Sequence, residues 1–504
     1  MKLKLSLTLL LLFAATTATA YDFEVDGILY KINGNEVAVT YKGQYHYSVY
    51  GYYKGDVVIP DSVTYNGKTY AVTAIGNYAM ELCYDLKSIY IPTTVRTIGK
   101  NAFNACSKIE EINIPSSVTY IGEYALAHCK GFTSITVDDD NPVYDSRNNC
   151  NAINETATNT LLFGCRNTVI PNDITTIGAS AFSSREYMNT IHIPNSVTAI
   201  GRAAFIYCTN MTNIEFPHSV TCIDDKAFYG CTGLKDLNIP NTVCHIGNQA
   251  FYETSGLESI TVENGNPFYD SRDNCNAIIE TASNTLMLGC VNTVIPTSVT
   301  VIGREAFRKC ISMVGIDIPN SIVIIASMAF SGCSKLSSVV IPTSVTEIQS
   351  YSFANCTALK TIDISNTVTS IGDGAFNGCS GLDTITCRAV TPPSIKRGSF
   401  MCNNVDIYSR VTLRVPRGAI EAYKAQEEFG RFASIVAIEG EPESGDVDGD
   451  GKLTVSDVTG IIDKVLAGAV SLEDYPAADV NGDGLINIAD VTALVDYLLS
   501  GTWN

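Results

Sequence analysis

Two segments near the C-terminal end of the chain carry oxygen side chains at the spacing of a metal-binding loop. They read DVDGDGKLTVSD from Asp446 and DVNGDGLINIAD from Asp479. A hard cation such as Ca²⁺ takes six to eight oxygens, from side chains at loop positions 1, 3, 5, 9 and 12 and a backbone carbonyl at position 7. The sequence therefore predicts two calcium sites, with the ligands Asp446, Asp448, Asp450, Lys452, Thr454 and Asp457, and Asp479, Asn481, Asp483, Leu485, Asn487 and Asp490.

Each loop needs a sharp turn and a helix to hold its ligands. Gly451 and Gly484 stand at position 6, where the chain must turn. Aspartate replaces the usual glutamate at position 12 in both loops. Apolar residues at helical spacing follow each loop, namely Val458, Ile461, Ile462 and Val465, and then Val491, Leu494, Val495 and Leu498. We expect a small all-α calcium-binding domain here.

Most of the remaining chain is a repeat of 23 residues that carries little recognisable chemistry. One clean copy, LKSIYIPTTVRTIGKNAFNAC, runs from Leu86 to Cys106. LKSIYI alternates as a strand does, the proline ends pairing, and AFNAC has the spacing of one helical turn. A single unit cannot bury its own apolar face, so the copies must stack as a solenoid. Stacking predicts a parallel sheet with short helical returns and a long surface, which favours binding over catalysis.

Two coils are ten residues longer than the others and are near copies of each other. They begin at Ser134 and Ser259, 125 residues apart. Asp145, Ser146 and Cys150 in the first could suggest a nucleophilic site, but we favour a turn capped by Asp and Ser. A disulfide joining Cys150 to Cys165, or Cys275 to Cys290, is possible by spacing, although these positions also suit the core.

Nine of the 17 cysteines follow the repeat, three residues after its large apolar residue. A residue in this phase is expected to pack inward as a small hydrophobe. Thr254 and Arg185 stand at the same phase, so a covalent partner is not required. The ladder comprises Cys83, Cys106, Cys129, Cys208, Cys231, Cys310, Cys333, Cys356 and Cys379. The five dispersed histidines do not have the spacing of a zinc site.

The N-terminal residues and the charge balance point to an exported, acidic protein. Residues 1–20 are typical of a signal peptide, with Ala18-Thr19-Ala20 as the cleavage site. No apolar stretch is long enough to span a membrane. Of the net charge of -19, residues 440–504 contribute -11, from 13 acidic residues and two lysines. Binding of nucleic-acid phosphates needs a basic face, which an acidic chain does not offer, so we expect no nucleic-acid partner.

Changes in composition divide the chain into six segments. We predict a signal peptide at 1–20, an N-terminal cap at 21–59, a solenoid at 60–390, a C-terminal cap at 391–439, a linker at 440–445 and a calcium-binding domain at 446–504. The tyrosine-rich stretch 45–53 could form an aromatic platform for a glycan, but packing of the N-terminal cap is the favoured interpretation.

The ordered strand, proline, Ile-Gly and Ala-Phe elements of the repeat resemble those of BspA-like leucine-rich-repeat surface proteins. The resemblance covers about residues 57–439 and implies a right-handed leucine-rich-repeat solenoid without catalytic residues. The two loop-helix units resemble a type I dockerin, which implies a cohesin-like partner. In that family, partner choice depends on loop positions 10 and 11. Here these are Val455-Ser456 and Ile488-Ala489 instead of the common Ser-Thr pairs.

These features predict a non-enzymatic binding or adhesion protein at the cell surface, in the periplasm or in the medium. Its solenoid would contact a protein or glycan on a host or bacterial surface. Residues 446–504 would dock to a cohesin-like module or another exported protein. The alternative is a targeting or scaffold subunit of an extracellular polysaccharide-degrading complex. A further alternative is that the calcium loops only fold a small cap.

Overall fold

The fold was analysed in a computed structural model that describes residues 20–43, 51–396, 398–402, 406–438, 445–448, 452–468, 475–481 and 484–500. The predicted signal peptide up to residue 19 and most of the predicted linker lie outside these ranges. The chain divides into two compact units. The first comprises residues 1–211, 219–228 and 245–250, and the second comprises 212–218, 229–244 and 251–504.

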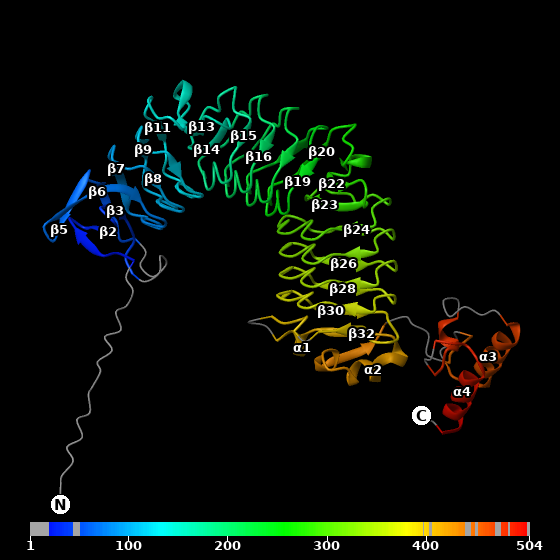
Figure 1. Ribbon diagram of the computed structural model, residues 1–504. Coiled ribbons are helices and arrows are strands. Elements are labelled where there is room, and N and C mark those ends of the chain that lie inside the picture. The colour runs from blue at the N-terminus through cyan, green and yellow to red at the C-terminus, as the bar shows by residue number, and fades with distance from the viewer. Residues whose placement is uncertain are drawn as a thin grey trace, which may run out of the picture. The chain divides into compact units, whose positions relative to one another are not determined.

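The first unit begins with an antiparallel sheet and continues as stacked parallel coils (Figure 1). Its elements are β1 (Phe23–Val25), β2 (Ile28–Asn33), β3 (Glu36–Val39), β4 (Gly55–Val58), β5 (Ser62–Tyr65), β6 (Lys68–Ile75), β7 (Leu86–Tyr90), β8 (Thr97–Ile98), β9 (Glu111–Ile114), β10 (Tyr120–Ile121), β11 (Ser134–Val137), β12 (Tyr144–Asp145), the 3₁₀ turn η1 (Arg147–Asn149), β13 (Ala152–Glu155), β14 (Thr160–Gly164), β15 (Thr176–Ile177), β16 (Ala199–Ile200), β17 (Cys222–Ile223) and β19 (His245–Ile246).

The second unit repeats this plan from its own enlarged coil to the end of the solenoid. Its elements are β18 (Asp236–Ile239), β20 (Ser259–Val262), β21 (Tyr269–Asp270), η2 (Arg272–Asn274), β22 (Ala277–Glu280), β23 (Thr285–Gly289), β24 (Val301–Ile302), β25 (Ile324–Ile325), β26 (Ser338–Ile341), β27 (Glu347–Ile348), β28 (Thr361–Ile364), β29 (Ser370–Ile371), β30 (Thr384–Cys387), β31 (Ser394–Ile395), α1 (Ile407–Arg410), β32 (Thr412–Val415), η3 (Arg417–Ala419), α2 (Ile420–Ala425), η4 (Phe429–Arg431) and β33 (Ser434–Ala437).

Neighbouring coils pair in parallel and in step with the 23-residue repeat. In the short-strand sheet Tyr120 pairs with Thr97, and Ile121 pairs with Ile98. The repeated phenylalanines stack inside, with ring centroids 5.0–5.1 Å apart among Phe182, Phe205 and Phe228 in the first unit, and 5.0–5.6 Å apart among Phe307, Phe330, Phe353 and Phe376 in the second. The predicted solenoid with a parallel sheet and an apolar interior is confirmed.

The return segment of each coil is a run of tight turns and not a helical turn. The N–H of Ala79 donates to the Gly76 carbonyl, and the N–H of Cys83 donates to the Met80 carbonyl. Tyr78 and Leu82, inside these turns, have φ of 60° and 59°. This backbone leaves alternate N–H groups free to pair with the next coil, as Met80 does with the Ala102 carbonyl at 2.8 Å. A helical turn would consume those donors within the coil.

Close stacking explains the glycine of the Ile-Gly step. A Cβ placed on Gly99 would lie 2.5 Å from the backbone nitrogen of Asn77 in the preceding coil. Backbone cannot move aside as a flexible side chain can, so a larger residue would push the two coils apart at this point.

Aromatic packing closes the last coil of the solenoid. Phe400 lies 5.4 Å from Phe432 and 6.2 Å from Phe429, measured between ring centroids. The hydroxyl of the buried Tyr423, in α2, donates to the Ala389 carbonyl at 2.9 Å. These aromatic residues therefore cover the apolar interior of the final coil.

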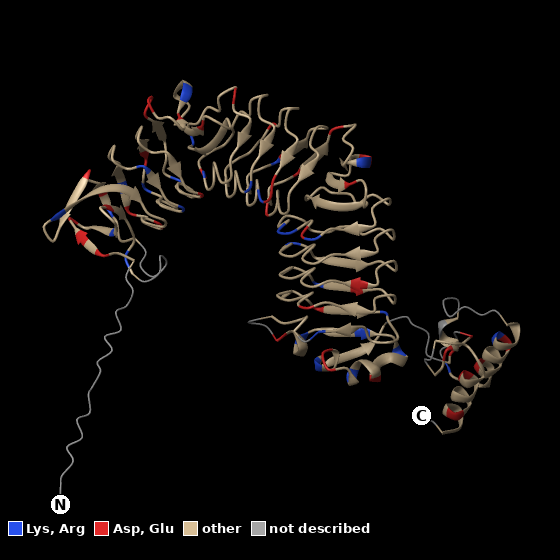
Figure 2. Ribbon diagram, in the orientation of Figure 1, with Lys and Arg blue, Asp and Glu red and all other residues tan. Residues whose placement is uncertain are grey.

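The tail contains two helices, α3 (Val455–Ala467) and α4 (Ile488–Ser500), with a 3₁₀ turn η5 (Pro476–Ala478) between them. Ile461, Ala478, Val491 and Leu494 form its buried core. The predicted small all-α domain is confirmed. Among the described residues, no helix combines the length and apolarity needed to cross a membrane. Lysines and arginines are interspersed with acidic residues along the coils and do not gather in a basic stripe (Figure 2).

Candidate metal centre

The first acidic loop brings three of its predicted ligands together. Carboxylate oxygens of Asp446, Asp448 and Asp457 all lie within 4.8 Å of one another. Asp446 and Asp457 are buried and Asp448 is exposed. Clustered carboxylates repel one another unless a cation balances their charge. The donor set is entirely oxygen and anionic, which fits Ca²⁺ better than a softer metal.

Asp457 connects the start of the loop to the start of the helix. Its Oδ1 accepts from the backbone N–H of Val447 at 2.8 Å and of Asp448 at 3.3 Å. Its Oδ2 accepts from the backbone N–H of Thr454 at 2.8 Å. Burial raises the pKa of Asp457, but these N–H donors outweigh burial and leave the pKa below its usual value. The carboxylate therefore stays ionised where a cation would need it.

Thr454, predicted as a ligand at position 9, is also the N-cap of α3. Its hydroxyl accepts from the Ser456 N–H at 3.1 Å, and Asp457 completes a capping box with it. Capping fixes the first turn of the helix, so the loop and the helix form as one unit. The short side chain of aspartate at position 12 suits this double role.

The second loop makes equivalent hydrogen bonds. Oδ1 of the fully buried Asp490 accepts from the Val480 N–H at 2.8 Å, and its Oδ2 accepts from the Asn487 N–H at 2.8 Å. The Asn487 side chain accepts from the Ala489 N–H at 2.7 Å, as Thr454 does in the first loop. The buried Asp479 accepts from the Gly484 N–H at 3.0 Å.

The structure describes some of the remaining predicted ligands and not others. Asp450 and Asp483 lie outside the described residues. Lys452 and Leu485 are exposed, as expected of residues that would offer only their carbonyls, and Asn481 is exposed beside Asp479. The described oxygens fit a calcium ion in the first loop, and the parallel hydrogen bonds give the second loop the same frame.

Both tail helices expose apolar residues at matching positions. Val455 and Ile488, the first residues of α3 and α4, are 73% and 66% exposed. Leu466 and Leu499, near the helix ends, are 77% and 82% exposed. These four apolar side chains are therefore accessible to a partner on the two helices.

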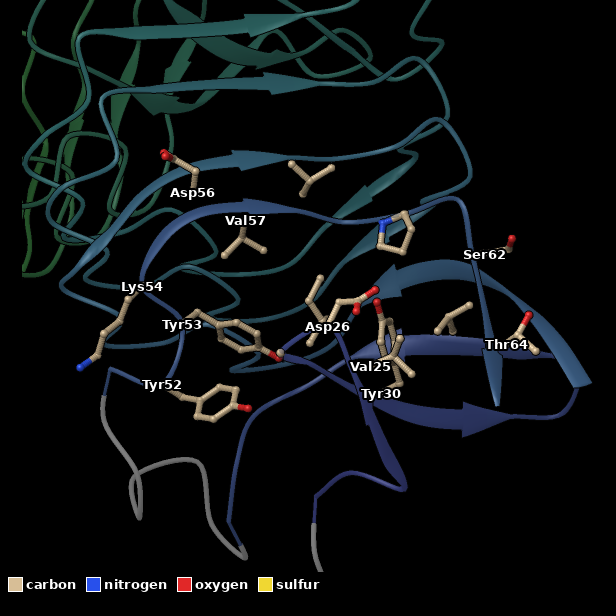
Figure 3. A pocket seen from close by; sticks show the side chains of 15 residues that line it. Val25, Asp26, Tyr30, Tyr52, Tyr53, Lys54, Asp56, Val57, Ser62 and Thr64 are labelled. Carbon is tan, nitrogen blue, oxygen red and sulfur yellow. The ribbon is translucent and has the colours of Figure 1, made fainter. Parts of the chain in front are cut away.

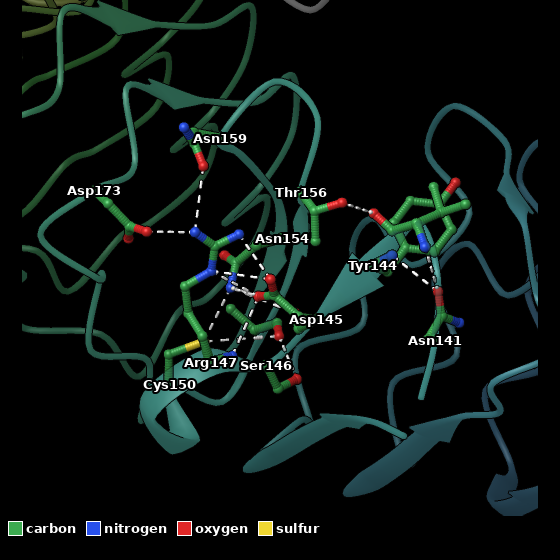
Figure 4. A network of polar contacts seen from close by, with 12 residues as sticks. Asn141, Tyr144, Asp145, Ser146, Arg147, Cys150, Asn154, Thr156, Asn159 and Asp173 are labelled. Carbon is green, nitrogen blue, oxygen red and sulfur yellow. Dashed lines mark hydrogen bonds and ion pairs between the residues drawn. The ribbon is translucent and has the colours of Figure 1, made fainter. Parts of the chain in front are cut away.

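The enlarged coil of the first unit contains a dense polar network that builds a turn (Figure 4). The Asp145 carboxylate accepts from the backbone N–H and the side chain of Arg147. The Ser146 hydroxyl donates to the Ala152 carbonyl at 2.7 Å. Asn141 donates to two carbonyls of the preceding coil and accepts from the N–H of Tyr144. These hydrogen bonds hold the segment as a turn, in agreement with the favoured turn interpretation.

A serine-histidine contact that the sequence did not reveal lies beside this coil. His128 Nδ1 is 2.9 Å from the Ser183 hydroxyl and 2.8 Å from the Ser184 hydroxyl, across 55 and 56 residues. Burial lowers the pKa of His128, and nearby Arg185 lowers it further. Ser183 is fully buried, and within the described residues no carboxylate hydrogen-bonds to the His128 ring. The pair bridges two coils and lacks the access that a nucleophile needs.

The ladder cysteines are buried thiols, as the sequence predicted. The structure joins none of the 17 cysteines in a disulfide, and this includes Cys150, Cys165, Cys275 and Cys290. Cys244 is exposed, and Cys222 and Cys402 are half-buried.

Comparison with known families accounts for both parts of the chain. The BspA type leucine rich repeat region matches residues 73–165, 157–272 and 287–406, in six copies. The chain belongs to the BspA-type leucine-rich-repeat family. Residues 444–499 of this BspA-type protein match the dockerin type I domain. Both families consist of binding or assembly modules and neither is catalytic.

Solved structures that match the chain come from several bacteria. A leucine rich cell surface protein from Faecalibacterium prausnitzii A2-165 is 26% identical, with 83% of this chain and 95% of that chain covered and a TM-score of 0.47. A leucine-rich repeat protein from Bacteroides ovatus ATCC 8483 is 23% identical, with 78% and 100% covered and a TM-score of 0.34. The pneumococcal vaccine antigen PcpA is 19% identical, with 84% and 99% covered and a TM-score of 0.46. No curated protein matches the chain significantly.

Proposed function

We propose that this chain is an exported, non-enzymatic binding protein. Its solenoid contacts a protein or glycan on a host or bacterial surface, and its tail docks in a calcium-dependent way to a cohesin-like module. The convergence of Asp446, Asp448 and Asp457 beside two helices with exposed apolar residues carries the docking half of the proposal. Dockerin type I domains bind calcium and typically bind cohesins.

The two loops would each hold one calcium ion. The first would use the side chains of Asp446, Asp448, Asp450, Thr454 and Asp457 with the Lys452 carbonyl. The second would use those of Asp479, Asn481, Asp483, Asn487 and Asp490 with the Leu485 carbonyl. Bound calcium would balance the loop charge, and Asp457 and Asp490 would transmit that order to the helices through their backbone hydrogen bonds.

A second candidate function is a targeting or scaffold subunit of an extracellular polysaccharide-degrading assembly. The dockerin match favours it, since docking to a cohesin would place the solenoid beside other components. In that case the solenoid ligand is a polysaccharide instead of a surface protein.

Three binding assays on two proteins test both halves of the proposal. The full chain and a variant with Asp446→Ala, Asp448→Ala and Asp479→Ala would be applied to a cohesin panel, a glycan array and a panel of matrix proteins. We expect the variant to lose calcium-dependent capture by cohesins and to keep the solenoid's binding pattern. Capture by cohesins that persists in a chelator would contradict calcium-dependent docking. An absence of glycan and matrix-protein binding would contradict the solenoid half.

A further inference from the structure

A groove opens in the first unit between the turn that follows β1 and the strand β4 (Figure 3). Its volume is about 860 Å³, within the range of ~300–1,000 Å³ that ligand sites occupy. Val25 and Ile28 line one side, and Val57 and Val58 line the other. All lining residues belong to residues 25–64, so the groove lies within one compact part of the chain.

One side of the groove is the edge of a strand. Among the described strands, β4 pairs with β7 alone, in parallel. The Gly55 N–H donates to the Asp85 carbonyl at 2.9 Å, and the Ile59 N–H donates to the Tyr90 carbonyl at 3.1 Å. Alternate residues of a strand direct their backbone groups to opposite sides, so those of Asp56 and Val58 point away from β7. The free edge of β4 therefore offers backbone donors and acceptors to a further strand.

The edge of β4 is protected only in part, because its pairing with β7 shifts register between Gly55 and Asp56, whereas Val57 and Val58 pair regularly. Natural edges are blunted by proline, lysine or bulges that discourage a further strand. β4 reads Gly-Asp-Val-Val, and Val58 is 66% exposed. The neighbouring edge strand β5, Ser-Val-Thr-Tyr, is more polar. An exposed valine beside free backbone groups is suited to pairing with another chain.

The lining favours a peptide over a glycan. Sugars bind to open aromatic faces, but here Tyr30 and Tyr53 are buried. The Tyr53 hydroxyl is used, since it accepts from the Leu29 N–H and donates to the Thr40 carbonyl. The Lys42 ammonium covers the Tyr52 ring at 4.7 Å from its centroid. The exposed part of the groove is therefore lined by the aliphatic Val25, Val57 and Val58 beside polar side chains, without an open aromatic face among the described residues.

Charged residues set the polarity of a ligand in this groove. The exposed Lys54 lies at the end of the groove where β4 begins, and the exposed Asp26 lies nearer its middle (Figure 3). A complementary segment would carry an acidic group near Lys54 and a basic side chain near Asp26. Between them, apolar side chains at every second position would meet the valines.

We propose that the β4 edge binds an extended peptide segment of a partner protein by strand addition. The peptide backbone pairs with Asp56 and Val58, and its alternate apolar side chains rest on Val25 and Val57. Main-chain pairing gives such complexes their affinity, and the side-chain contacts give them specificity. This inference rests on the proposed binding function of the solenoid and names the ligand class at one of its sites.

The test uses a phage-displayed library of random dodecapeptides panned on the immobilised full chain. Enriched peptides would be synthesised and titrated by fluorescence anisotropy against four proteins. These are the natural chain, Val58→Pro, Val58→Lys and Val58→Thr. The proline removes an N–H that β7 does not use, and the lysine places a charge on the edge. Threonine keeps the backbone donor and the branched shape, so it is the matched control.

Strand addition predicts enriched peptides with apolar residues at alternate positions. Their Kd should rise by about tenfold or more with Val58→Pro and Val58→Lys, because a buried peptide carbonyl loses its donor or the edge is blocked. It should change by less than about threefold with Val58→Thr. Failure to enrich any peptide, or equal affinity for all four proteins, would overturn the proposal. If Val58→Pro bound surface proteins or glycans as well as the natural chain does, their binding site would lie outside the groove. The strand-addition proposal would then fail for these ligands, and the proposed binding function would stand.

Discussion

The Sγ of Cys106 donates to the carbonyl oxygen of Met80, in the preceding coil, at 3.0 Å. Other ladder cysteines make the same contact, at 3.0–3.2 Å, namely Cys129 with Phe103, Cys208 with Phe182, Cys333 with Phe307, Cys356 with Phe330 and Cys379 with Phe353. The exceptions in the ladder, Thr254 and Arg185, also donate to backbone carbonyls. The position therefore suits a buried side chain that can donate a hydrogen bond, which is a cysteine in most coils.

We predict that native alkylation will distinguish the ladder from the surface thiol. Burial raises the pKa of Cys106 and of Cys333, so neither forms the reactive thiolate at neutral or mildly alkaline pH. The exposed Cys244 should react first with iodoacetamide, and the ladder should react only after denaturation. Peptide mass spectrometry of native and unfolded samples measures both. Labelling of Cys106 at the rate of Cys244, or its recovery in a disulfide, would refute a buried-thiol ladder.

Arg185 should be essential to the stability of the first unit. Its guanidinium is fully buried and donates to the carbonyls of Gly164 at 2.9 Å and Cys129 at 2.6 Å, and also to those of Ser183 and Leu126. Arg185→Met would leave several buried carbonyls without this donor, and each costs ~1–3 kcal/mol. We expect a loss of about 3 kcal/mol or more in unfolding free energy, measured by denaturant titration. The exposed Arg202→Met is the control, and a loss for Arg185→Met no larger than the control's would contradict this role.

The contact of His128 with Ser183 and Ser184 should make the first unit sensitive to mild acid. The pKa of His128 is lowered in the folded state by burial and by Arg185, whereas an unfolded histidine titrates near about 6.5. Below that pH the unfolded chain takes up a proton that the folded chain resists. Stability from this group is therefore complete above about pH 6.5 and is lost as the pH falls through the folded pKa.

Thermal unfolding between pH 7.5 and pH 5.5 measures this effect. His128→Asn should reduce the fall in melting temperature on acidification, because the titrating group is gone. The exposed His192→Asn is the matched control and should behave as the natural chain does. An identical fall in all three proteins would show that His128 does not contribute. The Lys130–Glu186 ion pair spans the same two coils, and neither substitution changes one of its residues.

The repeat and the acidic loops were predictable because each rests on a strict local pattern. Ile98 pairs with Ile121 in the observed register, 23 residues apart, as the period requires. The clustering of Asp446, Asp448 and Asp457 follows from loop spacing alone. The tight turns of the return were not predictable from its spacing, because Ala-Phe-x-x-Cys fits a helical turn equally well. Positive φ at Tyr78 and Leu82 depends on hydrogen bonds to the next coil.

The contacts across the enlarged coils were missed for a different reason. His128 and Ser183 are 55 residues apart, and no local pattern links them. The sequence did contain one indication of these contacts, because Arg185 stands at the repeat position that a buried cysteine occupies in most coils. A buried arginine needs several hydrogen-bond acceptors around it. The groove beside β4 depends on the packing of the N-terminal strands, which lie outside the repeat and carry no period.

The central claim is that calcium organises the tail for docking, and a calorimetric calcium titration of the full chain tests it most directly. The variant Asp446→Ala, Asp448→Ala removes two of the three clustered carboxylates of the first loop. The control Asp463→Ala, Asp496→Ala removes as many exposed carboxylates from α3 and α4 without touching either loop. The natural chain and the control should show saturable binding at two sites, and the loop variant should lose one of them. An absence of saturable binding at millimolar calcium, or an equal loss in both variants, would contradict the account.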